Sequence, residues 1–170
     1  MNFETYRKIL VKYWGFTSFK PLQEEIIKSV VAGKDTLGLM PTGGGKSLTF
    51  QVPAVAAEGI CLVITPLIAL MKEQVGRLNS MEIRSMAIHS GMSAEEIEIA
   101  MENCIYGNYK FLYISPERIS TSIFRNKVAR FNLSLVAIDE AHCISQWGYD
   151  FRPSYLRIAS LRDHIPADVP

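Results

Sequence analysis

Apolar residues in the first part of the chain recur at helical intervals. Between residues 3 and 14 they lie three or four positions apart, which predicts an amphipathic helix. A second helix is expected to begin at Pro21, because proline suits the first turn of a helix, and to end near Gly33. The residues that define the first pattern are Phe3, Tyr6, Leu10, Tyr13 and Trp14.

From residue 36 onward, short apolar runs alternate with segments of helical character. Helices are expected over residues 66–78 and 93–106, the second opening with Ser93 and Glu96 in the spacing of a capping box. Apolar strands separated by helices are typical of a parallel sheet that is covered on both faces. We therefore expect an α/β fold, a doubly wound parallel sheet with an N-terminal helical segment, and ligands beyond the carboxyl ends of the strands. The expected strands are TLGLM (36–40), CLVIT (61–65), SMAIH (85–89), FLYIS (111–115) and LVAID (135–139).

The composition narrows the possible classes of protein. With 170 residues, 48% of them hydrophobic, the chain can bury a core. No apolar run approaches the roughly 20 residues of a membrane span, and the N-terminus lacks the apolar run of a signal peptide. Cys61, Cys104 and Cys143 lack C-x-x-C or His-pair spacing, which disfavours a disulfide framework or a structural zinc site and favours a reducing compartment. A net charge of +1 disfavours a strongly basic nucleic-acid binder but is compatible with a local cluster of Lys and Arg.

The stretch MPTGGGKS (40–47) resembles a phosphate-binding loop at the end of an expected strand, with a helix expected to begin at Lys46. Glycines let successive backbone N–H groups point at phosphate oxygens, and the helix N-terminus adds its positive dipole end. The strict pattern G-x-x-x-x-G-K-[ST] has glycine where Met40 stands, so a ligand-free glycine turn is the alternative. Lys46 would reach the β- and γ-phosphates, and the Ser47 hydroxyl would bind Mg²⁺. The residues expected to bind nucleotide here are Thr42, Gly43, Gly44, Gly45, Lys46 and Ser47.

A second candidate site follows the run LVAID, which ends in Asp139 and Glu140. Asp139 would hold the Mg²⁺ ion, and Glu140 would accept the proton of the water that attacks the γ-phosphate. A lone Asp-Glu pair after a strand is more often a solvated turn. Its combination with the glycine loop favours a catalytic role.

Four further features of the chain are the segments MPTGGGKS, TPLIALMKEQV, YISPERI and DEAHCISQWGYDFRP. Together they resemble the RecQ family of DNA helicases, a branch of the DEAH-type superfamily-two helicases. The resemblance extends from Tyr13 to Arg157. The family's loops begin with Ala or Met before Pro-Thr-Gly, so Met40 fits. The resemblance implies that residues 35–170 form the first RecA-like motor domain. Helices over residues 1–34 would carry the adenine-recognition residues and form one structural unit with this domain.

The resemblance implies roles for further residues. In GFTSFKPLQEE, Gln23 matches the glutamine that binds the adenine edge, and Phe16 matches an aromatic that stacks on the base, whereas Phe19 is the better candidate for the core. Lys20 departs from the family's arginine and lacks the planar guanidinium. DNA contacts are implied for two segments at strand ends, with the residues Thr65, Pro66, Ser115 and Arg118.

The segment after His142 resembles the family's aromatic-rich loop, which couples DNA binding to hydrolysis. Aromatic side chains there would stack on exposed bases while a cation meets a phosphate, and packing of the aromatics into the core is the alternative. Tyr149 departs from the family's histidine. His142 would link this loop to the nucleotide site. The implied loop residues are Trp147, Tyr149, Phe151 and Arg152.

As a whole, the resemblance implies an ATP-dependent 3′–5′ DNA helicase that uses ATP and Mg²⁺ in replication, recombination or repair. The implied partner is DNA, as a single strand or a single/double-strand junction, with no membrane and no zinc in this part. The implied location is the cytoplasm, associated with a nucleoid, or a nucleus, and the protein is not expected to be secreted. A second motor domain with an arginine for the ATP site is expected after Pro170, so this chain alone is expected to hydrolyse ATP poorly and not to unwind DNA. The alternatives are a nucleic-acid-binding module without catalysis and a DEAH-type RNA helicase.

Overall fold

The computed structural model describes residues 3–41, 43–148 and 150–170. The chain divides into two compact units, Met1–Glu58 together with Pro170, and Gly59–Val169. The expected boundary between residues 34 and 35 falls inside the first unit, and the division into 1–34 and 35–170 stays a prediction.

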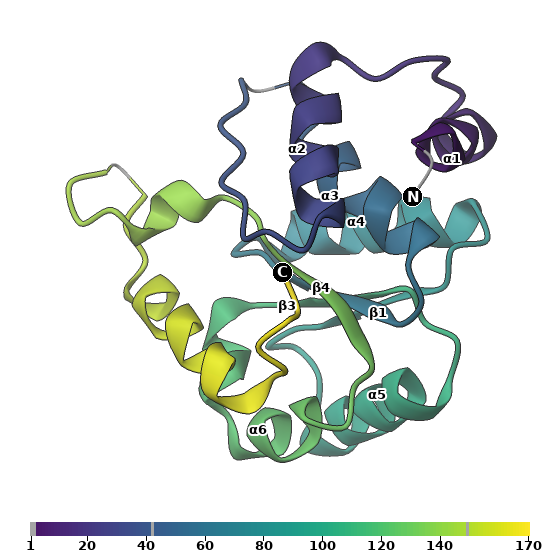
Figure 1. The fold of residues 1–170 in the computed structure, drawn as a ribbon. Coiled ribbons are helices and arrows are strands. Elements are labelled where there is room, and N and C mark those ends of the chain that lie inside the picture. Colours follow the sequence, from purple (N-terminus) through teal and green to yellow (C-terminus); the bar gives the residue numbers. More distant parts are fainter. Residues whose placement is uncertain (1–2, 42, 149) are drawn as a thin grey trace. The chain divides into compact units, whose positions relative to one another are not determined.

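The first unit contains three helices around a small apolar core (Figure 1). Both N-terminal helices predicted from periodicity are confirmed, and the first ends at Gly15, whose positive φ of 73° suits glycine. The third begins at Leu48, two residues after the expected start at Lys46. The helices are α1 (Glu4–Trp14), α2 (Pro21–Val31) and α3 (Leu48–Ala56). The core consists of Tyr6, Leu10, Phe19, Ile27 and Val52.

The strand expected over residues 36–40 is not formed. This segment has no regular secondary structure, and the side chains of Leu37 and Leu39 are 75% and 77% exposed. A strand exists only through hydrogen bonds to a neighbouring strand, and no described strand pairs with this segment. The prediction from the apolar run was therefore wrong in this structure.

The second unit contains a four-stranded parallel sheet in the order β2-β3-β1-β4. A helical segment follows each of the first three strands, which is what parallel connections require. These four strands were predicted, and the α/β class is confirmed. The strands are β1 (Ile60–Ile64), β2 (Ser85–Ile88), β3 (Phe111–Ile114) and β4 (Leu133–Ile138). The helices are α4 (Ile68–Ser80), α5 (Ala94–Tyr106), η1 (Pro116–Ser120), α6 (Ser122–Val128), η2 (Ala141–Ile144) and η3 (Pro153–His164).

Helices lie on both faces of this sheet, with α4 on one face and α5 and α6 on the other (Figure 1). Successive strand residues point to opposite faces, so Ile60, Leu62 and Ile64 of β1 all join the core under α5 and α6. At the start of α5, the Ser93 hydroxyl accepts a hydrogen bond from the Glu96 N–H, and the Glu96 carboxylate accepts one from the Ser93 N–H. The predicted capping box is therefore present. In the described part of the chain, no helix is both long and apolar enough to cross a membrane.

The register of the sheet aligns the carboxyl ends of three strands. Ile64 of β1 is paired with Ile114 of β3 and with Ile138 of β4. The residues that follow these three positions therefore leave the sheet at the same edge, and they are Thr65, Ser115 and Asp139.

Candidate functional site

Each unit contains a group of candidate functional residues, and the group in the first unit is the glycine loop before α3. Gly43 and Gly45 adopt positive φ angles of 75° and 80°, a conformation that costs other residues free energy. The Gly44 N–H donates to the Pro41 carbonyl oxygen at 3.0 Å, which closes a tight turn. Thr42, one of the predicted nucleotide contacts, lies outside the described residues. Gly43 and Gly45 thus occupy positions that favour glycine, and the loop forms a compact turn before α3.

Gln23 anchors this loop from α2. Its Nε2 donates to the carbonyl oxygens of Gly44 and Gly45, both at 3.1 Å, while its Oε1 accepts from the Lys20 N–H at 2.9 Å. A Cβ atom added at Gly45 would lie 2.4 Å from Gln23 Nε2, so the side chain and the loop are closely packed. Gln23 is buried, and its amide contributes directly to the loop's conformation. The resemblance alone had indicated only a contact with adenine.

The two phenylalanines near Gln23 have different environments. Phe19 is buried in the core of the first unit, as predicted, and its ring contacts that of Phe3. Phe16 is 52% exposed, so core packing does not explain it and its ring is accessible to a ligand. Lys20 is also exposed. The adenine-binding roles of these residues stay predictions.

The candidate residues of the second unit lie at the carboxyl edge of the sheet. The Thr65 N–H donates to the Ile114 carbonyl oxygen at 3.0 Å, and the Asp139 N–H donates to the Ile64 carbonyl oxygen at 2.9 Å. Thr65 Oγ1 is buried and has no hydrogen-bond partner among the described residues. The structure therefore brings Thr65 and Asp139 to one edge of the sheet, where each donates a backbone hydrogen bond to a neighbouring strand.

The predicted DNA contacts Pro66, Ser115 and Arg118 belong to the segments that follow β1 and β3 at this edge. Ser115 is buried, and its carbonyl oxygen accepts from the Arg118 N–H at 3.0 Å in the first turn of η1. The Arg118 guanidinium donates through Nη2 to the His89 carbonyl oxygen at 3.3 Å. Their DNA-binding roles stay predictions.

The two acidic residues after β4 have a constrained geometry. Asp139 Oδ1 accepts from the Glu140 N–H at 2.9 Å. Glu140 itself has φ 53° and ψ 42°, the left-handed conformation, which costs a residue other than glycine of order 1 kcal/mol or more. Strained backbone of this kind gathers at functional sites, where the surrounding structure holds it in place. The turn directs the Glu140 side chain toward His142, with Oε2 3.2 Å from Nδ1.

The aromatic-rich loop after η2 begins with an accessible tryptophan. Trp147 is 98% exposed, which excludes core packing for this side chain, whereas Phe151 is half-buried. Arg152 Nε lies 3.3 Å from Asp150 Oδ1, so the predicted cation is paired within the loop. Tyr149 lies outside the described residues. Of the described loop aromatics, Trp147 therefore fits a stacking role best.

Three residues at this edge were not singled out from the sequence. The Tyr155 hydroxyl donates to the Asp139 carbonyl oxygen at 2.7 Å, and burial raises the pKa of Tyr155, so the donor stays protonated. Cys143 Sγ lies 3.5 Å from Asp150 Oδ2, and burial together with that carboxylate raises the pKa of the Cys143 thiol. The only signal in the sequence for these residues was their place within or just after the DEAHCISQWGYDFRP segment.

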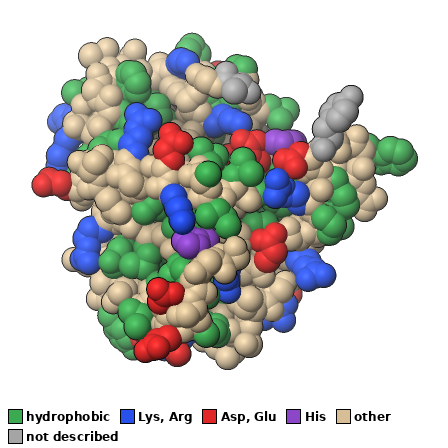
Figure 2. Space-filling model, turned by 180° about the vertical axis from the view of Figure 1, so that it is seen from behind, with side chains coloured by type: hydrophobic (Ala, Val, Ile, Leu, Met, Phe, Trp, Pro, Cys, Tyr) green, Lys and Arg blue, Asp and Glu red, His purple; other side chains and the backbone are tan. Residues whose placement is uncertain are grey.

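Charged side chains do not form one continuous basic surface on the face seen in Figure 2, where Lys and Arg are interspersed with Asp and Glu. This agrees with the net charge of +1. Contacts with nucleic acid on this face would therefore depend on individual residues rather than on a broad positive field.

Comparison with known proteins assigns the chain to a family. Residues 20–169 match the family model described as DEAD/DEAH box helicase. The chain is 43% identical over 160 residues to a probable ATP-dependent DNA helicase RecS of Bacillus subtilis, covering 94% of this chain and 32% of that protein. It is 46% identical over 156 residues to the ATP-dependent DNA helicase RecQ of the same organism, and the match covers 91% of this chain and 26% of that protein. The chain thus spans about a third or less of the length of these curated relatives.

Solved structures support the fold. A DUF1998 helicase, MrfA, solved with DNA and AMPPNP, matches with a TM-score of 0.67 and 22% identity over 82% of this chain and 21% of that chain. A hypothetical ATP-dependent RNA helicase from Sulfolobus tokodaii matches with a TM-score of 0.62 and 21% identity, and the match covers 85% of this chain and 43% of that chain. At these identities the likeness concerns the fold alone, and that fold is the RecA-like fold of helicases.

Proposed function

The chain belongs to the DEAD/DEAH box helicase family, and from this premise we propose that it is the ATP-binding motor domain of a DNA helicase similar to RecQ. The observation that carries the proposal is the compact glycine loop with Gly43 and Gly45 at positive φ, directly before Lys46, Ser47 and α3. Such a loop supplies backbone N–H groups and a helix N-terminus to a phosphate chain. The high identity to RecQ-type proteins supports DNA as the nucleic acid.

The proposal gives four side chains a role in ATP binding and hydrolysis. Lys46 binds the β- and γ-phosphates, and Glu140 orients the attacking water and accepts its proton. The Ser47 hydroxyl and the Asp139 carboxylate are oxygen donors, the type that Mg²⁺ prefers, so these residues fit a magnesium site. The ion would neutralise charge on the phosphates when bound. Tyr155 keeps the Asp139 backbone in place through its hydrogen bond.

We propose a double role for Gln23, because its amide already binds the loop. It supports the phosphate loop, and together with Phe16 and Lys20 it contacts adenine. Replacement of Gln23 with alanine is expected to weaken binding of both ATP and tripolyphosphate, the latter about fivefold for a lost hydrogen bond of about 1 kcal/mol. ATP binding falls by the larger factor, since the base contact is lost as well. Isothermal titration calorimetry with both ligands measures the two effects.

The control for this prediction is Glu25→Ala, an exposed position on the same helix, which should change neither affinity. Unchanged tripolyphosphate binding by Gln23→Ala would show that the contacts of Gln23 with the glycine loop contribute nothing to phosphate binding. Equal losses for both ligands would instead argue against the adenine contact.

The exposed Trp147 provides a test of DNA binding. Replacement with alanine is expected to weaken binding of single-stranded DNA roughly tenfold, because one base–aromatic stack is worth about 1–3 kcal/mol. Fluorescence anisotropy of a labelled oligonucleotide measures this affinity, with Tyr106→Ala, another exposed aromatic, as the matched control. Equal affinities of Trp147→Ala and the parent chain would remove Trp147 from the DNA site.

The same assay separates the alternatives. A binding module without catalysis should bind DNA equally with and without ATP, whereas a motor domain should change its affinity. The presence of Lys46, Ser47, Asp139 and Glu140 speaks against the binding module. An RNA oligonucleotide that competes better than DNA would favour the RNA helicase. The resemblance of CISQWGYDFRP to RecQ proteins favours DNA.

We further propose that the whole protein unwinds DNA with 3′–5′ polarity at strand junctions, in replication, recombination or repair. This proposal comes from the RecQ-type relatives, of which the chain spans a third or less. A DNA substrate also implies a location at the nucleoid or in the nucleus. An unwinding assay that compares DNA duplexes with a 3′ or a 5′ single-stranded tail tests the proposed unwinding activity and its polarity.

A further inference from the structure

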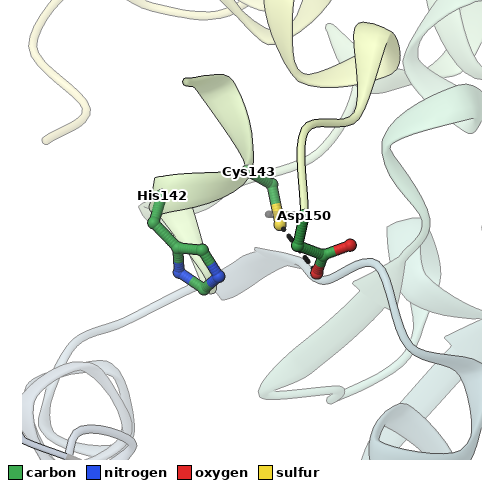
Figure 3. Close-up of side chains that lie close together, drawn as sticks. All are labelled: His142, Cys143 and Asp150. Carbon is green, nitrogen blue, oxygen red and sulfur yellow. Dashed lines mark hydrogen bonds between the residues drawn. The ribbon is translucent and has the colours of Figure 1, made fainter. Parts of the chain in front are cut away.

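Three side chains of different chemistry converge after β4. His142 and Cys143 belong to η2, and Asp150 follows seven residues after Cys143. Each offers one potential metal-ligand atom, and the three atoms all lie within 4.8 Å of one another. Figure 3 shows the three side chains extending into the same space, with the Asp150 carboxylate facing the Cys143 sulfur.

Backbone contacts hold this cluster together. The Cys143 N–H donates to the Glu140 carbonyl oxygen at 2.9 Å, which fixes η2 immediately after the left-handed Glu140. The Arg152 N–H donates to the Cys143 carbonyl oxygen at 2.9 Å, which brings the segment around Asp150 back against η2. The convergence of the three side chains is therefore set by the course of the main chain.

The cysteine spacing disfavoured a zinc site and the resemblance implied none in this part, but the fold brings together ligands that form no motif in the sequence. We propose that His142, Cys143 and Asp150 bind a zinc ion. A thiolate, an imidazole and a carboxylate are all zinc ligands, and bond lengths of about 2.0–2.3 Å in a tetrahedron put ligand atoms roughly 3.5 Å apart. The Cys143 sulfur and the Asp150 oxygen are already 3.5 Å apart. Magnesium and calcium prefer oxygen ligands alone, so the sulfur and nitrogen donors select a softer ion. Three protein ligands leave a fourth position for water.

The contact between Glu140 and His142 supports this assignment. A histidine that binds a metal through one ring nitrogen commonly holds a carboxylate with the other. Glu140 Oε2 lies 3.2 Å from His142 Nδ1, which leaves Nε2 for the metal. On binding, the Cys143 S–H bond breaks, its proton passes to the buffer and a sulfur–zinc bond forms. Zinc would thereby tie together the two ends of the loop that carries Trp147.

Cobalt(II) binding by the metal-free protein tests the site without nucleotide or DNA, so the result is independent of the proposed function. Cobalt replaces zinc in such sites, and its thiolate charge-transfer absorption reports the sulfur ligand. We expect a saturable band at one ion per chain that zinc abolishes by displacement. Cys143→Ser should lose the band, and His142→Gln and Asp150→Asn should weaken binding at least tenfold.

Matched controls are Cys104→Ser, His164→Gln and Asp163→Asn, which change the same residue types outside the cluster and should bind cobalt like the parent. Because Cys143 is buried, circular dichroism checks that its variant folds, and the exposed His142 and Asp150 provide independent tests. The proposal is overturned if the parent shows no thiolate band. It is also overturned if His142→Gln and Asp150→Asn both bind as tightly as the parent.

Discussion

Replacement of Lys46 with alanine is expected to weaken ATP binding by roughly 100-fold. The lysine ammonium would make charge-assisted hydrogen bonds to the β- and γ-phosphates, and a hydrogen bond to a charged group is worth about 1.5–3 kcal/mol. The glycine turn and the N-terminus of α3 remain in the variant, so the backbone part of phosphate binding persists. Fluorescence titration with an ATP analogue measures the change in affinity.

The control for Lys46 is Lys34→Ala, which removes an exposed lysine from the same compact unit and should leave the affinity unchanged. A Lys46→Ala chain that binds the analogue as tightly as the parent would remove the basis of the phosphate-loop assignment. An equal loss in both variants would point to a general effect of charge.

The sequence predicted the sheet well because its four strands are apolar runs, and each of these runs lies beside another strand of this chain. β1 and β3 are buried along their whole length, and residues buried in this way have to be apolar. The run over residues 36–40 has the same composition but no described partner strand. The pattern of apolar residues indicates the preference of a segment for strand conformation, whereas a strand also needs a neighbouring strand with which to pair.

The candidate site was predictable where its residues are adjacent in sequence. The glycine loop and the Asp139-Glu140 pair are local motifs whose chemistry can be read from spacing. The anchoring of the loop by Gln23 joins residues more than twenty positions apart, and the bond from Tyr155 to Asp139 joins residues sixteen apart. Contacts of this kind depend on tertiary packing. The left-handed backbone of Glu140 also has no signal in its residue type.

Replacement of Glu140 with glutamine is expected to lower the rate of ATP hydrolysis roughly 10²–10⁴-fold, the usual contribution of a general base. Glutamine has nearly the same shape and leaves the phosphate loop unchanged, so affinity for ATP should be unchanged. The amide cannot accept the proton of the attacking water. Glu117→Gln, which changes an exposed glutamate in the same unit, should hydrolyse ATP like the parent.

We propose that the loop around Lys46 binds ATP and that Glu140, after β4, is the general base in ATP hydrolysis. Single-turnover hydrolysis of labelled ATP, with protein in excess so that slow turnover is measurable, tests it most directly in the parent chain and in Glu140→Gln. We expect equal fractions of bound ATP and a hydrolysis rate at least 100-fold lower in the variant, the lower bound for loss of a general base. Equal hydrolysis rates in the two proteins would contradict it.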